Sequence, residues 1–582
     1  MKALKYLNSF LLKYWKKLLI GLVITTSARV FSLFMPSYIN ESIQVIEQYF
    51  RNEISQAEAK QMLLIDIGII VGTTLIAAIL TFLMRQYIIN VSRYIEYDLK
   101  NTIYDHYQIL SSSFYKKNRV GDLMNRISED VSQVRMYAGP AIMYGLQTLT
   151  LFVILIPLMF LKAPDLALYT ILPFPLLSFL IYRISRLIHV RSTAVQTYLS
   201  TLSTFTQERF SGIAIVKAYH LEQKIDQDMQ VLAEEGKQTA MDLAKINAWF
   251  FPLMLLLIGA SNIIVMYVGG RMYIDGSIDS VGLIAEFILY VNMLTWPVTV
   301  VGWLTSIIQR AEASQERIND FLQIQPEIND HLADTQLPIQ GQVEFNNVSY
   351  KYPDTGIRAL KNVNLKIRSG ETVALMGKTG AGKSTVIDLI TRLIEPQEGT
   401  VLIDGVSINN YYLTELRSSM GVVPQDSFLF SDTIENNIRF GKLNATEEEI
   451  ENAARLADVH QNILDFPKGY QTLLGERGIS LSGGQKQRVS IARAMIKGPQ
   501  IFLFDDCLSA VDTETEEVIL GNIKNQSKEK TTLIVSHRMA TVKHADRILV
   551  LDEGQIVQEG THNELISTPG FYQDLYQEQL NG

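Results

Sequence analysis

The sequence predicts a multi-domain membrane protein in which an all-α domain of six membrane-spanning helices precedes an α/β domain. Six long apolar segments all lie before residue 320, and short β-type runs separated by turns and helices begin at Val343. The chain has 582 residues, of which 47% are hydrophobic, so it is too long for one hydrophobic core. We expect a transmembrane domain in residues 1–320, a linker in 321–342 and an α/β domain in 343–582.

Composition narrows the possible partners and ligands. The formal net charge is −8, and no basic patch with interleaved aromatic residues occurs, which argues against a nucleic-acid partner. Cys507 is the single cysteine, so an intramolecular disulfide and a multi-cysteine metal site are excluded. We expect Cys507 to be a small buried residue.

The N-terminal segment, Met1 to Leu19, interleaves five lysines with Leu, Tyr, Phe and Trp. A signal peptide places its charges first and ends at a small-residue cleavage site, which is not the pattern here. We expect an amphipathic helix on the inner membrane surface that leads into the first span.

Each expected span approaches the roughly 20 apolar residues needed to cross the hydrocarbon core. The expected spans are Leu18–Asn40, Ile67–Met84, Gly139–Leu161, Leu166–Tyr182, Ala248–Gly270 and Phe287–Gln309. A single segment of this kind is compatible with a buried core helix, but six in succession are not. Arg29 lies inside the first span, while Asp66 and Glu286 lie at the edges of the second and sixth.

Lys and Arg in the short flanks predict the orientation. The N-terminal arm is basic, and the loop after the second span contains Arg93, Lys100, Lys116, Lys117, Arg119 and Arg126. The loop after the first span contains four glutamates against one Arg and one Lys. Both termini and the α/β domain are therefore expected in the cytoplasm.

The two inner loops, roughly 85–136 and 183–247, are long and have helical periodicity, whereas the outer loops are short. We expect the spanning helices to extend into the cytoplasm and to present contact surfaces there. Residues 310–329 are expected to extend the sixth helix, and Pro326 with the polar stretch to Gln342 marks the domain boundary.

A P-loop pattern follows the strand-like run Thr372–Met376 and precedes a helix. Its residues, with the one that follows, are Gly377, Lys378, Thr379, Gly380, Ala381, Gly382, Lys383, Ser384 and Thr385. The glycines allow backbone N–H groups to surround phosphate oxygens at the positive end of the helix. Lys383 is expected to reach the β and γ phosphates of ATP, and the Ser384 hydroxyl to hold Mg²⁺.

A second apolar strand, Ile501–Phe504, ends at Asp505 and Asp506. Asp505 is expected to be the Walker B ligand of Mg²⁺, because it ends an apolar strand of a chain that also has a P-loop. Without the P-loop, an Asp that caps the next turn would be the better interpretation.

Between these motifs lies the run Leu481, Ser482, Gly483, Gly484 and Gln485, followed by a helix rich in Arg and Ala. Paired glycines permit close approach to phosphate, and the helix N-terminus is positive. Alone, such a run is more often a loop. Just upstream of Walker B it resembles the signature motif of ABC ATPases.

Across essentially its whole length the chain resembles ABC exporters of the multidrug-resistance type. The resemblance implies a RecA-like ATPase domain with a helical insert near 426–496, in which Tyr352 stacks on adenine and Gln425 is the Q-loop contact to Mg²⁺. It also implies that His537 is the switch histidine near the γ-phosphate. Further matches are Gly475–Gly478 to a cross-linking loop, Ser509–Asp512 to the D-loop, and 121–126 and 212–217 to the segments around two coupling helices. In this family one P-loop and another chain's signature motif share each nucleotide, so a second half-transporter is expected as partner.

Asp506 departs from the family pattern, in which a Glu at this position polarises the attacking water. Asp is one methylene shorter, so its carboxylate is set back by about 1.5 Å, and a misplacement of about 1 Å can cost about 10²-fold in rate. Leu481–Gln485, Gln425 and His537 are intact, so the chain is suited to complete a fast site on a partner that supplies its own Glu. The pair Asp505 and Asp506, followed by Cys507–Asp512, resembles one subunit of heterodimeric bacterial multidrug exporters. A homodimer that tolerates Asp506 and turns over slowly is the alternative.

The cargo is the least determined feature. We expect export of a small hydrophobic or amphipathic compound from the bacterial cytoplasmic membrane, with membrane lipids as further contacts. Arg29 and Glu286 either face the transport path or pair with each other or with neighbouring helices. Asn292, Thr295 and Trp296 are expected to line the path near a kink at Pro297. A homodimeric lipid flippase and a regulatory, non-transporting ABC subunit are the alternatives.

Overall fold

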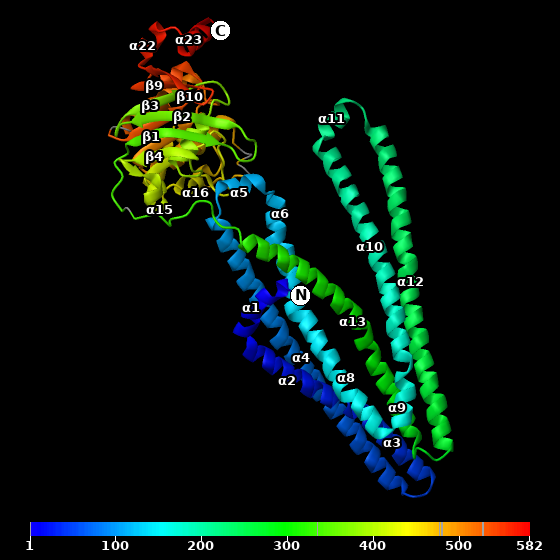
Figure 1. Cartoon of the computed structure of the whole chain (residues 1–582). Helices are drawn as coiled ribbons and strands as arrows, with labels where there is room; N and C mark the ends of the chain where they lie inside the picture. The colour runs from blue at the N-terminus through cyan, green and yellow to red at the C-terminus, as the bar shows by residue number, and fades with distance from the viewer. Residues whose placement is uncertain (1, 335, 476–477, 479–480, 527–528, 582) are drawn as a thin grey trace. The chain divides into compact units, whose positions relative to one another are not determined.

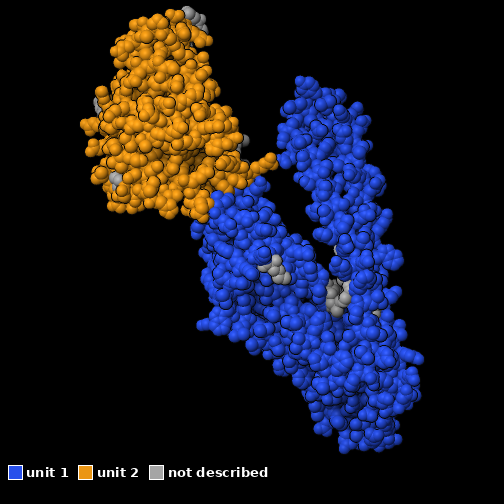
Figure 2. All heavy atoms as spheres, in the orientation of Figure 1, with its two compact units in different colours: residues 1–108, 121–324 blue, residues 109–120, 325–582 orange. Residues whose placement is uncertain are grey.

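The computed structural model describes residues 2–334, 336–475, 478, 481–526 and 529–581. The chain forms two compact units (Figure 2). The first comprises residues 1–108 and 121–324, and the second comprises 109–120 and 325–582. The first unit is helical, and the second contains all the β-strands described.

Long helices make up the first unit (Figure 1). They are η1 Ala3–Leu7, α1 Asn8–Lys13, α2 Trp15–Ser32, α3 Phe34–Phe50, α4 Gln56–Ile109, α6 Val120–Asn125, η2 Arg126–Asp130, α7 Val131–Met136, η3 Tyr137–Ala141, α8 Ile142–Lys162, α9 Pro164–Ile171, α10 Pro173–Ser211, α11 Ile213–Ala218, α12 Glu222–Ile274 and α13 Val281–Leu322. Helices α10 and α12 pack side by side and are joined by α11. The inner loops are thus helical extensions of the spans, as the sequence predicts.

Five helical runs in the described part of the chain are long and apolar enough to cross a membrane: Trp15–Phe50, Gln56–Ile109, Val120–Lys162, Glu222–Ile274 and Val281–Leu322. The fourth expected segment, 166–182, is divided between α9 and α10 by a turn at Leu172. Pro173 and Pro175 follow this turn, and proline interrupts the hydrogen-bond ladder of a helix. Its helical character is confirmed, and the turn is a feature that the sequence did not predict.

The third run contains two π-helical stretches, η2 and η3, which the sequence did not predict. Pro140 lies inside η3 and supplies no backbone N–H. A π-helical turn shifts the register of the side chains that follow it. Asp130, at the end of η2, is buried and accepts hydrogen bonds from Arg317 of α13.

One apolar core joins α8, α9, α12 and α13 with Leu33, which lies in the turn between α2 and α3. Its buried members include Leu33, Leu151, Leu155, Met159, Val265, Phe287, Tyr290, Val291 and Leu294. Glu286 lies beside this core in the first turns of α13 and is completely buried. Lys162 forms an ion pair with it at 2.5 Å, and Asn40 and Ser37 donate hydrogen bonds to it at 2.8 and 2.9 Å.

Two sheets form the second unit (Figure 1). A four-stranded antiparallel sheet has the order β2 (Arg358–Ile367), β1 (Val343–Lys351), β4 (Glu398–Ile403), β5 (Val406–Ser407). A six-stranded sheet has the order β10 (Gln555–Gly560), β9 (Arg547–Asp552), β3 (Thr372–Met376), β8 (Thr531–Val535), β7 (Ile501–Asp505), β6 (Met420–Val423). All its pairs are parallel except β9–β10.

The second unit also has helices on and around these sheets. They are α5 Ser112–Lys117, α14 Lys383–Ile390, η4 Ile408–Asn410, α15 Leu413–Ser418, α20 Thr513–Gln526, α21 Met539–Val542, α22 His562–Ser567 and α23 Phe571–Asn581. The expected helical insert contains α16 Ile434–Arg439, α17 Glu447–Leu456, α18 His460–Leu464, η5 Gly469–Gln471 and α19 Gly483–Ile496. The helical insert packs around an apolar core that includes Cys507. The expected burial of Cys507 is therefore confirmed, and this burial raises the pKa of the thiol.

The segment 109–120, between the second and third expected spans, belongs to the second unit. The Lys116 ammonium on α5 lies 3.9 Å from the Asp388 carboxylate on α14 and 6.0 Å from the centre of the Tyr352 ring. Ser111 donates a hydrogen bond to Glu327 at 3.2 Å. The expected domain boundaries place this loop in the transmembrane domain and do not predict that it packs on the α/β unit.

Candidate nucleotide site

The loop between β3 and α14 has a backbone that only glycine adopts without strain. Gly377 and Gly382 have φ values of +154° and +103°. A Cβ on Gly377 would lie 2.1 Å from the Leu551 carbonyl oxygen, and one on Gly382 would lie 2.3 Å from the Ala359 carbonyl oxygen. Strand β3 is central in its sheet and buried, so it fixes where this loop begins. The arrangement is strand, glycine loop and helix, as the P-loop pattern predicts.

Lys383 begins α14 and turns its side chain back over the loop. Its ammonium donates hydrogen bonds to the carbonyl oxygens of Gly377 and Lys378 at 2.8 and 2.9 Å. Burial lowers the pKa of Lys383, while the nearby Asp506 and Asp505 oppose that shift. A half-buried cation whose hydrogen bonds go to neutral carbonyls is suited to receive an anion.

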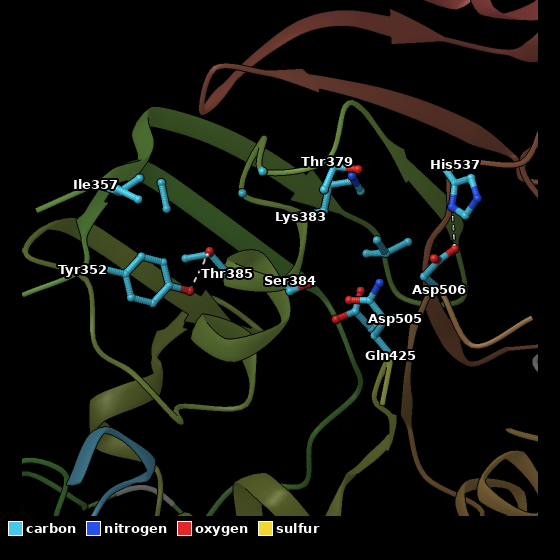
Figure 3. A pocket seen from close by; sticks show the side chains of 14 residues that line it. Tyr352, Ile357, Thr379, Lys383, Ser384, Thr385, Gln425, Asp505, Asp506 and His537 are labelled. Carbon is cyan, nitrogen blue, oxygen red and sulfur yellow. Dashed lines mark hydrogen bonds and ion pairs between the residues drawn. The ribbon is translucent and has the colours of Figure 1, made fainter. Parts of the chain in front are cut away.

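Oxygen donors gather at the first turn of α14. Asp505 ends β7 and is hydrogen-bonded to the side chain of Ser384. Burial raises the pKa of Asp505, and the Ser384 hydrogen bond opposes that shift. Gln425 follows β6, the strand paired with β7, so the amide reaches the same region (Figure 3).

Asp506 and His537 form a pair at the other end of the pocket (Figure 3). His537 Nδ1 lies 3.0 Å from Asp506 Oδ1. Asp506 has a left-handed backbone, with φ of +44°, and its N–H donates to the Val535 carbonyl at 2.8 Å. Asp and Asn adopt this conformation several times more often than other non-glycine residues. The backbone of β8 therefore helps to hold the carboxylate next to the histidine.

Tyr352 follows β1 and lies at the opposite end of the pocket from His537 (Figure 3). Its hydroxyl lies 3.1 Å from the Thr385 hydroxyl. The Tyr350 ring meets the Tyr352 ring edge to face, with centroids 5.1 Å apart. These contacts hold an aromatic ring in place beside the P-loop helix.

A pocket of about 340 Å³ connects these groups. Its lining includes the predicted residues Tyr352, Thr379, Gly380, Gly382, Lys383, Ser384, Thr385, Gln425, Asp505, Asp506 and His537. Ile357, Ala359 and Val535 also line it, and sequence reasoning missed them because apolar strand-end residues carry no motif.

Three predicted P-loop residues do not line the pocket. Gly377 and Ala381 are covered by their neighbours, and Ala381 is buried. The Lys378 ammonium lies instead 5.7 Å from the centre of the Phe571 ring. These residues contribute to the site through the conformation of their backbone.

The signature run lies outside the pocket lining. Ser482 is the N-cap of α19, where its hydroxyl accepts from the Gln485 N–H at 3.3 Å and its N–H donates to Gln485 Oε1 at 3.0 Å. Gly483 is exposed, while Leu481 is buried. The N-terminus of α19 is therefore exposed and positive, and it does not line the pocket of its own chain.

Gln487 connects this helix to the D-loop, and sequence reasoning missed it. Its side-chain oxygen accepts from the Ala510 N–H at 3.1 Å, and its amide lies 3.3 Å from the Ser509 hydroxyl. Glu476 and Arg477 of the expected cross-linking loop lie outside the described residues.

Comparisons with known proteins cover both units. Residues 18–298 match the ABC transporter transmembrane region, and residues 360–509 match the ABC transporter family. The probable multidrug resistance ABC transporter ATP-binding/permease protein YheI of Bacillus subtilis is 34% identical, with 99% of this chain and 97% of that protein covered. The multidrug resistance-like ATP-binding protein MdlA of Escherichia coli is 32% identical, with 100% and 97% covered.

A solved structure gives the same fold. A bacterial Atm1-family ABC exporter with ATP bound superposes with a TM-score of 0.80 at 24% identity, with 97% of this chain and 99% of that chain covered. The P-loop pocket, the apolar helices and these relatives all indicate the same family. The chain belongs to the ABC transporter family, as an exporter that carries a membrane domain and an ATP-hydrolysing domain in one polypeptide.

Proposed function

We propose that this chain is one subunit of a heterodimer that exports hydrophobic or amphipathic compounds from the cytoplasmic membrane, and that its own ATP site turns over slowly. The observation that carries this proposal is Asp506, an Asp at the position that follows the Walker B residue. Its counterpart is the signature run, which has no substitution. A chain of this kind completes a fast site on its partner and mostly holds ATP in its own.

The pocket supports a defined orientation for ATP. Tyr352 is at one end and would stack on the adenine, while the P-loop backbone lies between Tyr352 and the acidic end (Figure 3). Lys383, which now donates to two loop carbonyls, would turn toward the β and γ phosphates. Burial makes this charge interaction stronger than it would be in water.

Oxygen donors of Ser384, Gln425 and Asp505 fit Mg²⁺, which prefers hard oxygen ligands and is usually held by few protein groups plus phosphate. That Asp505 and Ser384 line the same pocket supports this assignment. Bound Mg²⁺ would offset the negative charge that develops on the phosphate oxygens. The side chains of this chain would hold it and orient it toward the P-loop.

Asp506 would act as the group that polarises water, and His537 would contact the γ-phosphate. In the present geometry these two side chains bind each other. The carboxylate of Asp506 is set back by about 1.5 Å relative to that of a Glu. Positioning accounts for much of catalysis, so the shorter reach supports a slow site.

The signature segment supports obligatory dimerisation. Ser482 to Gln485 lie on the exposed N-terminus of α19 rather than in the pocket of their own chain. In the proposed dimer they would complete the nucleotide site of the partner. The partner's signature would in turn complete the pocket formed by Lys383 and Asp506.

Coupling would use the helical ends of the inner loops. Helix α5 packs on the ATPase unit next to Tyr352 and Asp388. Helix α11 has exposed apolar side chains at Ile213 and Ile215, followed by exposed Tyr219, which suit docking on the partner's ATPase domain. With both termini cytoplasmic, closure of the ATPase dimer would turn the cargo path outward, and hydrolysis would reset it.

Substituted heterodimers in lipid vesicles test the proposal. ATP-dependent uptake of a hydrophobic dye should be abolished when the partner's Glu is replaced by Gln. Lys383→Ala in this chain should reduce uptake far less. Equal loss from both substitutions would contradict the assignment of a slow site. ATPase stimulation by lipid A-type lipids rather than dyes would favour the lipid flippase.

A further inference from the structure

Two charged side chains in the expected spans have opposite surroundings. Glu286 is completely buried, and it is neutralised by Lys162 and bound by Asn40 and Ser37. Arg29 on α2 has no carboxylate partner among the described residues. Its guanidinium donates to one neutral group, the side-chain oxygen of Gln147 on α8, at 2.9 Å.

Gln147 is itself held in one orientation. Its amide nitrogen lies 3.1 Å from the Met84 sulfur on α4, so its oxygen faces Arg29. A guanidinium has five N–H donors, and this contact uses one of them. A charge within a membrane span is costly, and such residues commonly mark a path for substrate or ions.

The position of Arg29 along its helix gives it a place on such a path. Leu33 and Leu151 belong to the apolar core and lie one turn beyond Arg29 and Gln147 along α2 and α8. Both helices run from the inner to the outer side in the expected orientation. Arg29 and Gln147 therefore lie together one turn inward of this core, beside Met84, which belongs to a second apolar core with Ile88 and Met143.

Helix α13 has a buried face and an exposed face at that level, and Val300 and Ile307 farther along it are buried. Leu294 is 2% exposed and belongs to the core, whereas Trp296, two residues later, is 64% exposed. One turn inward of Gln147 on α8, the Tyr144 ring meets Trp303 of α13 edge to face, with centroids 5.5 Å apart. A cation and an aromatic pair thus follow one another inward from the closed core.

We propose that Arg29 is an anion-binding residue on the export path, which receives the carboxylate, sulfonate or phosphate group of an amphipathic cargo. The proposal rests on the export function proposed above and names its substrate class. Arginine matches planar anions with two parallel hydrogen bonds. Gln147 holds one side of the guanidinium, and Tyr144 with Trp303 offers an apolar surface for the body of the cargo.

Binding measurements on the full dimer in phosphatidylcholine vesicles test this without ATP. Three dansyl-dodecyl probes that share one apolar body end in a carboxylate, a neutral amide or an ammonium group, and energy transfer from tryptophan reports their affinity. A charge-assisted contact predicts that the carboxylate probe binds about tenfold more tightly than the amide. Arg29→Gln should bring the two within about twofold, without weakening the amide probe.

Gln147→Glu provides a second, independent variant. It adds a carboxylate at the atom that Arg29 already contacts, so it should remove the preference for the anionic probe while Arg29 is still present. Arg271→Gln is the matched control, because Arg271 is an exposed arginine near the end of α12 that pairs with Asp275. That variant should keep the full preference.

Each outcome decides the proposal. Equal affinity of wild type for the carboxylate and amide probes overturns it, as does an unchanged preference in either Arg29→Gln or Gln147→Glu. Adding phosphatidylglycerol separates the sources of the anion: loss of the preference would identify a lipid headgroup as the ligand, and a retained preference would identify free cargo. Failure of ATP-dependent uptake for every probe would instead contradict the proposed export function, because binding is measured without ATP.

Discussion

The P-loop pocket and the signature segment, both in the ATPase unit, differ in how completely they match an active enzyme. The pocket gathers Lys383, Ser384, Gln425, Asp505 and His537, but the short Asp506 occupies the position that we propose to polarise water. The signature segment has every expected residue and a fully formed capping box at Ser482. In the proposed heterodimer, the difference would mean that one chain retains the half-site that it lends to its partner, while the half-site that it keeps is weakened.

The largest effect is expected from Ser482→Ala in the heterodimer. This substitution removes a hydroxyl that we assign to the partner's fast site, so turnover should fall about 10²-fold, the typical loss for one donor to transition-state charge. Steady-state ATP hydrolysis by the purified heterodimer measures it.

Thr446→Ala is the matched control for that experiment. Thr446 caps α17 with the same capping box, so its loss costs a similar helix-capping energy of about 1 kcal/mol. It has no proposed contact with nucleotide and should leave turnover nearly unchanged. An equal loss of ATP hydrolysis in both variants would show that Ser482 acts only by stabilising its helix.

A tenfold or greater gain is expected from Asp506→Glu in this chain. The added methylene moves the carboxylate forward by about 1.5 Å, and correct positioning is worth up to about 10²-fold. Hydrolysis by the heterodimer whose partner carries Gln in place of its Glu is the measurement, because the site of this chain then accounts for the turnover. Asp506→Asn is the control, because its side chain carries no charge. If Asp506→Glu did not raise the rate of hydrolysis, side-chain length would not limit the site.

A smaller, opposite effect on stability is expected from Asp505→Asn. Burial raises the pKa of Asp505, so its charged form is a cost to the nucleotide-free protein. Removing the charge should stabilise that protein by about 1 kcal/mol, on the scale of one incompletely satisfied buried polar group. Thermal unfolding without nucleotide measures this, and Mg²⁺-dependent stabilisation should be lost.

The pH dependence of that difference follows from linkage. A carboxyl whose pKa is raised in the folded state costs stability once pH rises through that pKa. The advantage of the Asn variant should therefore be greatest at neutral pH and should shrink as pH falls through the raised pKa. A difference that grows toward acidic pH would contradict the assignment of a buried, charged Asp505.

The sequence identified most residues that line the P-loop pocket, because the motif is local in the chain. The glycine loop must follow a strand and begin a helix, so Gly377 to Ser384 were assigned from spacing alone. Ile357 and Val535 were missed, since only the packing of strands brings these apolar residues to the pocket. Lys378 was assigned to nucleotide binding, but its side chain lies over Phe571, which is distant in the chain.

The membrane unit was less predictable, because hydropathy gives spans but not partners. Glu286 and Lys162 are 124 positions apart, and their pairing depends on how α8 packs against α13. The turn at Leu172 divides a segment that contains no charged residue. The packing of α5 on the ATPase unit also required the tertiary structure, since residues 109–120 resemble the rest of the inner loop.

ATP hydrolysis by this chain purified alone in lipid, with Lys383→Ala as the blank, tests the central claim most directly. The account predicts turnover no better than the blank, restored when a Glu-bearing partner chain is added. Brisk turnover that rises with protein concentration would show a working homodimer. That result would contradict the assignment of Asp506 to a slow, ATP-holding site.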